Sequence, residues 1–310
     1  MTIRAIKLYL SSDFVYIFGY LLLYLIPFYR NFLSEQSLNM FFYFLLSFII
    51  LSPIYYFLST NRYSTNKPYT FLLSLVKVFR KEKLDFKDKT AARFLLVKIF
   101  FLPLMLQFFI NNYNWFLQNL KSASFFAIMI TLIFTIDTFV FFFGYSFEFK
   151  FLKNRVKSVE PTFFGWFVAI ICYPPFNGVV GNYFLWGAND YAYFWSDGVT
   201  MAFRVIIIFL LLVYLSATFA LGPKASNLTN RGIVTKFPYS VVRHPAYISK
   251  NLMWWITLLP VINFKFAMGM GVWLMIYFFR AYTEERHLSS DNDYIEYKKK
   301  VKWKFIPFVY

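Results

Sequence analysis

The chain has 310 residues, of which 59% are hydrophobic and 25% aromatic, and this composition excludes an ordinary soluble domain of that length. The 32 Lys and Arg residues against 15 Asp and Glu residues give a net charge of +17 at pH 7. Because the basic residues lie between apolar runs, they favour anionic lipid headgroups over nucleic acid as partners. A single cysteine, Cys172, and two histidines exclude an intrachain disulfide and predict no metal site.

Eight apolar runs have roughly the length that crosses a bilayer, about 20 residues. In chain order they are residues 14–29, 40–58, 94–110, 125–145, 162–176, 201–221, 247–262 and 266–282. The fifth run is short and contains Pro174-Pro175, so we expect it to be broken, tilted or re-entrant. The pattern predicts an all-α, polytopic membrane bundle with about eight transmembrane helices.

Basic residues gather in every second loop between these runs. Nine of them, from Arg62 to Arg93, separate the second and third runs, and further groups follow the fourth, sixth and eighth runs. The positive-inside rule therefore places both termini in the cytoplasm. The abundance of Phe, Ile, Lys and Asn is typical of an AT-rich, bacterial genome, in which case the membrane is the inner or plasma membrane.

The segment 71–86 is too basic to span the membrane, but its apolar residues recur at helical spacing. This pattern predicts a helix that lies in the cytoplasmic interface. We expect one integrated membrane domain, with an N-terminal transmembrane region over 1–220 and a C-terminal region over 221–310 that carries short polar motifs.

Asp137 lies within the fourth apolar run. An ionisable residue inside a span is a candidate for function. It could line a substrate cavity, or it could be a hydrogen-bonded packing residue.

Short polar motifs cluster near the C-terminal end of the chain. They are Gly232-Ile233-Val234-Thr235-Lys236-Phe237-Pro238-Tyr239, Val242-Arg243-His244-Pro245-Ala246-Tyr247, Glu284-Glu285-Arg286-His287-Leu288, Tyr294-Ile295-Glu296-Tyr297-Lys298-Lys299-Lys300-Val301 and Ile306-Pro307. The apolar stretch between Tyr247 and Glu284 is long enough for two spans and a tight turn. Such a hairpin brings the arginine, the imidazole and the paired carboxylates together at one membrane face.

From about residue 221 to residue 307, this order of motifs resembles the isoprenylcysteine carboxyl methyltransferase family and its bacterial relatives, including phospholipid methyltransferases. The resemblance implies an integral-membrane enzyme that binds S-adenosylmethionine on the cytosolic side and methylates a lipid-linked or amphiphilic acceptor. Phe237 departs from the pattern, because the family usually has glycine before the Pro-Tyr pair. A bulky residue there changes the backbone conformations open to the loop.

The residue types suit that cofactor. Its sulfonium cation requires carboxylate or carbonyl oxygens, its own carboxylate requires a cation, and its adenine requires apolar or aromatic walls. We assign catalytic roles to Arg243, Glu284 and Glu285. We assign cofactor-binding roles to Tyr239, His244, Pro245, Tyr247, Asn251, Glu285, Tyr294 and Tyr297. The structural alternatives are lipid contacts for Arg243, a solvated helix end for the glutamates and a packing role for His287.

The acceptor stays open at this stage. A carboxylate acceptor requires no general base, whereas an amine could give its proton to Glu284 or Glu285. An NADPH-dependent sterol-type membrane reductase is an alternative enzyme, although the paired glutamates would repel the phosphates of a dinucleotide. A non-catalytic membrane scaffold or transporter is the alternative from another class, although transporters usually spread polar residues over several spans. A homo-oligomer is possible under every reading.

Overall fold

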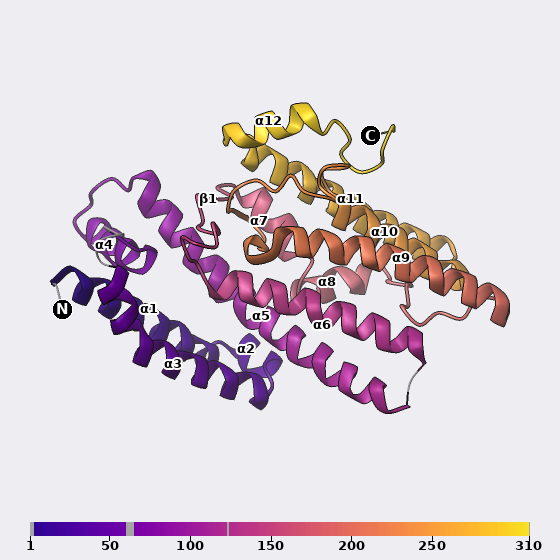
Figure 1. The fold of residues 1–310 in the computed structure, drawn as a ribbon, viewed down its shortest axis with the longest axis horizontal. Coiled ribbons are helices and arrows are strands. Elements are labelled where there is room, and N and C mark those ends of the chain that lie inside the picture. Colours follow the sequence, from indigo (N-terminus) through magenta and orange to yellow (C-terminus); the bar gives the residue numbers. More distant parts are fainter. Residues whose placement is uncertain (1–2, 60–64, 123, 310) are drawn as a thin grey trace. The chain divides into compact units, whose positions relative to one another are not determined.

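The computed structural model describes residues 3–59, 65–122 and 124–309 (Figure 1). Arg62 of the predicted basic loop lies outside these residues. The chain divides into two compact units, Met1–Ile110 and Asn111–Tyr310, and the boundary falls within one long helix, α5 (Phe86–Ser122).

The first unit is entirely helical in its described part. It contains α1 (Ile3–Leu25), α2 (Pro27–Phe32), α3 (Glu35–Ser59), α4 (Lys67–Phe79) and the greater part of α5. Buried polar contacts join α1 to α3: the Ser52 hydroxyl donates to Asp13 at 2.9 Å, and the Ser12 and Tyr56 hydroxyls lie 2.8 Å apart. Such pairs satisfy polar groups that neither lipid nor an apolar core can solvate.

The predicted amphipathic helix over 71–86 is confirmed as α4. Asn66 caps its start by accepting a hydrogen bond from the Tyr69 amide at 2.8 Å. The helix ends at Phe79, earlier than predicted, because Lys81 adopts a left-handed backbone with φ of 58° and a short loop then leads to α5. Its position in the membrane interface stays a prediction.

The second unit contains the C-terminal motifs. Its elements are α6 (Phe125–Ser146), β1 (Ser158–Val159), α7 (Phe163–Ile170), α8 (Phe176–Tyr183), α9 (Asp197–Leu221), the 3-10 helix η1 (Gly222–Lys224), β2 (Thr229–Asn230), α10 (Pro245–Leu258), the 3-10 helix η2 (Leu259–Val261), α11 (Phe264–Leu288) and α12 (Asn292–Lys300). The two short strands pair antiparallel, with Ser158 opposite Asn230.

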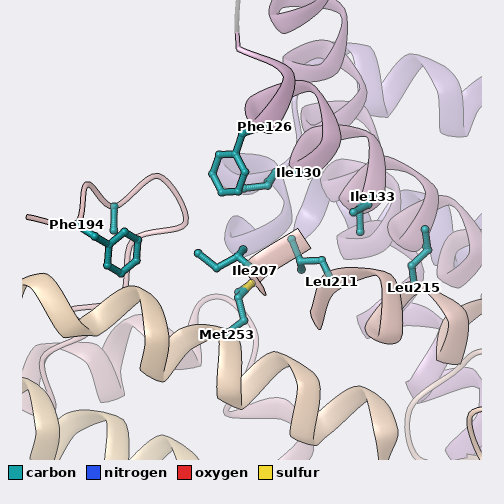
Figure 2. Close-up of a cluster of buried hydrophobic side chains, with 9 residues drawn as sticks. Phe126, Ile130, Ile133, Phe194, Ile207, Leu211, Leu215 and Met253 are labelled. Carbon is teal, nitrogen blue, oxygen red and sulfur yellow. The ribbon is translucent and has the colours of Figure 1, made fainter. Parts of the chain in front are cut away.

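The core of this unit lies where α9 packs between α6 and α10 (Figure 2). Phe126, Ile130 and Ile133 of α6 and Ile207, Leu211 and Leu215 of α9 meet there with Met253 of α10 and Phe194 of the α8–α9 loop. These positions recur every three or four residues, so each helix presents one packed stripe to its neighbours.

The loop between α8 and α9 also packs into this unit. Trp186 contacts the rings of Trp254 and Trp273 edge-on, at 4.7 and 5.8 Å between centroids. A glycine on α11, Gly269, allows the carbonyl of Leu185 to approach the helix, since a Cβ at that position would overlap it. This loop therefore fixes α10 and α11 in place.

Among the described residues, six helices are long and apolar enough to cross a membrane: α1, α3, α5, α6, α9 and α11. The predicted all-helical membrane bundle is confirmed, but the count of eight spans is not. The fifth predicted run is broken by a turn at Pro174-Pro175 into α7 and α8. The seventh is α10, whose 14 residues reach roughly 21 Å, less than the hydrocarbon core. The cytoplasmic position of the termini stays a prediction.

Candidate functional site

The hairpin of α10 and α11 brings the two polar motifs together, as predicted. Pro245 occupies the first turn of α10, where its missing N–H is tolerated. A third segment, 301–304, joins them from the C-terminal end. The backbone amides of Arg243 and His244 donate to the carbonyls of Trp303 and Lys304 at 3.0 and 2.9 Å.

Glu285 is the centre of this arrangement. Its Oε1 accepts a hydrogen bond from Arg243 Nε at 2.8 Å and lies 3.0 Å from His244 Nε2. The ammonium groups of Lys298 and Lys304 each lie 3.9 Å from Oε2. The Glu285 and Arg243 side chains are each 9% exposed, so this buried anion is neutralised by groups from three segments.

Arg243 has further partners besides Glu285. Its NH1 donates to the carbonyls of Val301 at 2.9 Å and Lys302 at 2.6 Å. The guanidinium therefore fixes the C-terminal segment against the start of α10 and orients the carboxylate of Glu285.

Glu284 has a different environment from Glu285. Its side chain is 46% exposed, and its Oε2 accepts a hydrogen bond from the Tyr247 hydroxyl at 2.9 Å. The Tyr247 ring is stacked on His244, with 5.3 Å between the ring centroids. Of the two glutamates, Glu284 is therefore the one with free acceptor capacity for a cation or a proton.

Three of the predicted tyrosines pack together in one cluster. Tyr294 and Tyr297 on α12 form a buried cluster with Val301, against which Tyr239 packs. Tyr297 donates its hydroxyl to the Tyr239 carbonyl at 2.7 Å. The buried hydroxyl of Tyr294 has no hydrogen-bond partner among the described residues, and burial together with the nearby carboxylates raises its pKa. It is thus a neutral donor that is ready for an acceptor.

Asn251 on α10 also carries a buried polar atom that is not fully satisfied. Its Nδ2 donates to the Tyr247 carbonyl at 2.8 Å, while no group in the described part of the chain donates to its buried Oδ1. Unsatisfied buried polar atoms are rare in folded proteins. Two of the predicted cofactor-binding residues, Asn251 and Tyr294, thus carry the kind of atom that a polar ligand would satisfy.

A cavity of about 600 Å³ opens beside the ion pair, within the usual range for small-ligand sites. It is lined by Arg243, Tyr282, Glu285, Arg286, Ser289, Lys298, Lys302, Trp303, Lys304 and Val309. Among these described residues five are basic and one is acidic. Of the predicted site residues, Arg243 and Glu285 line the cavity. Glu284 lies beside Glu285 on α11, and the remaining residues of the motifs lie on α10, on α12 or in the loop before α10.

Two further predicted polar residues lie apart from this cavity. Both carboxylate oxygens of Asp137 accept hydrogen bonds from α9, at 2.6 Å from the Thr218 hydroxyl and 2.7 Å from the Tyr214 hydroxyl. This geometry matches the packing alternative, and a role in a substrate cavity stays a prediction. His287 is buried, with Nε2 2.8 Å from the Ser158 hydroxyl of β1.

The sequence did not single out Trp303 or Lys304 as part of the site. Lys304 is 5% exposed, and burial lowers its pKa despite the nearby Glu285 carboxylate. In the sequence it belongs to a run of lysines that satisfies the positive-inside rule, so no signal distinguished it. Trp303 is likewise visible as a cavity residue only after the segment folds back.

The family model described as phospholipid methyltransferase matches residues 194–291, about a third of the chain. This segment is therefore a domain of that family, which includes the membrane methyltransferases of the isoprenylcysteine carboxyl methyltransferase type. A comparison with curated proteins gave no match. Together with the six apolar helices, the domain identifies an integral, multi-pass membrane protein and indicates a methyltransferase.

Proposed function

With its phospholipid methyltransferase domain as the premise, we propose that the protein binds S-adenosylmethionine beside the Arg243–Glu285 pair and methylates an amphiphilic acceptor from the bilayer. The observation that supports this most directly is the convergence of the two motifs on one buried carboxylate. The site lies at the ends of α10 and α11, where an apolar chain can enter from lipid while a polar cofactor enters from water. We place this face in the cytoplasm on the charge pattern of the loops.

The residues present fit the cofactor, which supplies an activated methyl group when bound. Arg243 and Lys302 line the cavity and offer cations for its carboxylate. The half-exposed Glu284 offers an anion for its ammonium or sulfonium group, and Trp303 offers an aromatic wall for adenine. The unpartnered Asn251 Oδ1 and Tyr294 hydroxyl add a polar acceptor and a polar donor.

The protein's own part in methyl transfer is alignment and exclusion of water, because an in-line displacement depends on both. The hydrogen bonds of Arg243 to the 301–302 carbonyls hold the cavity wall in place. If the acceptor is an amine, the half-exposed Glu284 can take its proton. If the acceptor is a carboxylate, the same fold requires no base.

The basic lining of the cavity favours a second candidate, an NADPH-dependent reductase. The sequence suggested that two glutamates would repel phosphates, but Glu285 pairs with Arg243 and lies 3.9 Å from the ammonium groups of Lys298 and Lys304. Five basic side chains around the cavity would suit a dinucleotide's phosphates. The domain match favours the methyltransferase.

Binding of S-adenosylmethionine, S-adenosylhomocysteine and NADPH to the detergent-purified protein tests the proposal by isothermal calorimetry. We expect both adenosyl ligands to bind, and Arg243→Ala and Glu285→Ala to weaken them at least about tenfold. Glu296→Ala is the matched control, since Glu296 is exposed and pairs with Lys299 on α12. Binding of NADPH alone would favour the reductase, and absence of binding to folded protein would reject both enzymes.

We further propose that the exposed basic residues near the C-terminal end contact anionic headgroups. Lys298 and Lys299 have side chains that are 50% and 66% exposed, and charges of this kind are attracted to an anionic leaflet. Cosedimentation with vesicles that contain or lack anionic lipid measures this contact with headgroups. For the transmembrane part over 1–220 we propose that it binds the apolar chain of the acceptor or contacts a second copy of the protein.

A further inference from the structure

Arg280 is a buried cation within a spanning helix. It lies on α11 eight residues before the C-terminal end at Leu288, roughly 12 Å along the axis, and it is 7% exposed. A guanidinium keeps its charge at any ordinary pH. A charge buried at such a place is costly unless an anion compensates it, so its partners decide its role.

The partners of Arg280 within the chain are neutral. Its NH2 donates to the Asn227 amide oxygen at 2.7 Å. Its Cζ lies 5.3 Å from the centre of the Tyr247 ring, 5.4 Å from Tyr277 and 5.8 Å from Tyr173.

Among the described residues no carboxylate lies within 4.0 Å of this guanidinium. Arg243 and Arg286, in contrast, pair with Glu285 and Glu160 at 2.8 and 2.7 Å. Arg280 thus has no anionic partner among the described residues, and a guanidinium in such a place can bind an oxyanion.

A second cation, the ammonium group of Lys250, belongs to α10. That ammonium lies 5.2 Å from the centres of the Tyr214 and Trp254 rings. Lys250, like Arg280, therefore contacts uncharged aromatic rings.

Arg280 is connected to the proposed reaction site through one side chain. The Tyr247 ring contacts the guanidinium, and the Tyr247 hydroxyl donates to Glu284 at 2.9 Å. We propose that Arg280 binds the oxyanion of the methyl acceptor, a carboxylate or phosphate group on an apolar chain, and selects anionic over neutral acceptors. This inference rests on the proposed function for the identity of the bound molecule as an acceptor.

The planar fork of a guanidinium can bind two oxygens of a carboxylate or a phosphate at once. The tyrosine rings around it keep water away and tolerate an apolar chain. If the oxyanion is a carboxylate, it can itself receive the methyl group. If it is a phosphate, it positions a second group of the same molecule beside Glu284.

Binding of three amphiphiles to the full-length protein in detergent tests the inference by calorimetry. The probes are dodecanoate, dodecyl phosphate and neutral dodecanol, which share one chain length. We expect wild type to bind at least one anionic probe about tenfold or more tightly than dodecanol, and the better probe identifies the class of oxyanion. Detergent partitioning cancels when two variants are compared with the same probe.

Three variants separate this role from a structural one. Arg280→Gln should remove the preference for anions. Asn227→Asp should also remove it without loss of stability, because it supplies an internal carboxylate beside the guanidinium. Arg204→Gln should retain the preference, because Arg204 belongs to α9 and stacks on the Phe126 ring of α6.

Equal binding of charged and neutral probes by wild type would overturn the inference, as would an unchanged preference in Asn227→Asp. Failure of the proposed function has a different signature. In that case the adenosyl ligands do not bind, while the anion preference and its loss in Asn227→Asp persist and support the Arg280 site alone.

Discussion

Replacing Glu285 by glutamine removes one charge and keeps the shape of the side chain. The carboxylate receives two short contacts, from Arg243 Nε at 2.8 Å and His244 Nε2 at 3.0 Å. A hydrogen bond that involves a charged group contributes about 1 kcal/mol more than a neutral one, so the two contacts lose about 2 kcal/mol. The poorer compensation of the buried Lys304, 3.9 Å away, raises the loss to about 2–3 kcal/mol.

Hydrogen exchange measures this loss where it should occur. The amides of Arg243 and His244 donate to the C-terminal segment at Trp303 and Lys304, and Glu285 supports that pairing. A loss of about 2–3 kcal/mol predicts roughly 30- to 150-fold faster exchange in a peptide that covers residues 241–246. Equal exchange in Glu285→Gln and in the exposed control Glu296→Gln would refute the proposed role of the buried carboxylate.

Three further predictions concern groups around the same site. Tyr294→Phe should stabilise the ligand-free protein by about 1 kcal/mol in thermal unfolding, because it removes a buried hydroxyl that has no partner among the described residues. The same variant should weaken S-adenosylmethionine binding in calorimetry. Tyr297→Phe should instead destabilise the protein by about 1 kcal/mol, since the Tyr297 hydroxyl donates a hydrogen bond to the Tyr239 carbonyl. Gly269→Ala should cost about 1–3 kcal/mol through overlap with a loop carbonyl, whereas Gly271→Ala, which faces open space, should not lower the unfolding temperature. Although burial raises the pKa of Asp291, hydrogen bonds from Lys157 and Asn230 lower it below its usual 3.8. The charged carboxylate therefore stabilises the fold fully above pH 3.8, and this stabilisation is lost as the pH falls through the lowered pKa. A pH series of unfolding temperatures should show a smaller loss of stability in acid for Asp291→Asn than for wild type.

Local patterns in the sequence determined the helical membrane architecture. Apolar runs such as 201–221 correspond to spanning helices because an apolar segment of that length must satisfy its own backbone in lipid. The periodic segment near residue 71 likewise became α4. The motifs around Arg243 and Glu285 met as predicted, because the apolar stretch between them forms a hairpin.

The sequence could not determine which of the predicted spans are complete. Run 162–176 had the composition of a span but is divided between α7 and α8. Run 247–262 is divided between α10, which begins at Pro245 and ends at Leu258, and the short 3-10 helix η2 that follows it. Hydropathy depends only on the composition of a segment, whereas the ends of its helix depend on local backbone geometry and packing.

Only the tertiary structure decided how the charges of the site are paired. In the sequence Glu284 and Glu285 are equivalent, yet the structure buries Glu285 against Arg243 and leaves Glu284 half exposed. Arg280 resembles any basic residue near a helix end, and only the structure shows that its hydrogen-bond partner is an amide and that no described carboxylate lies within 4.0 Å of it. The free energy of a charge depends on its surroundings in space, and those surroundings come from segments far apart in the chain.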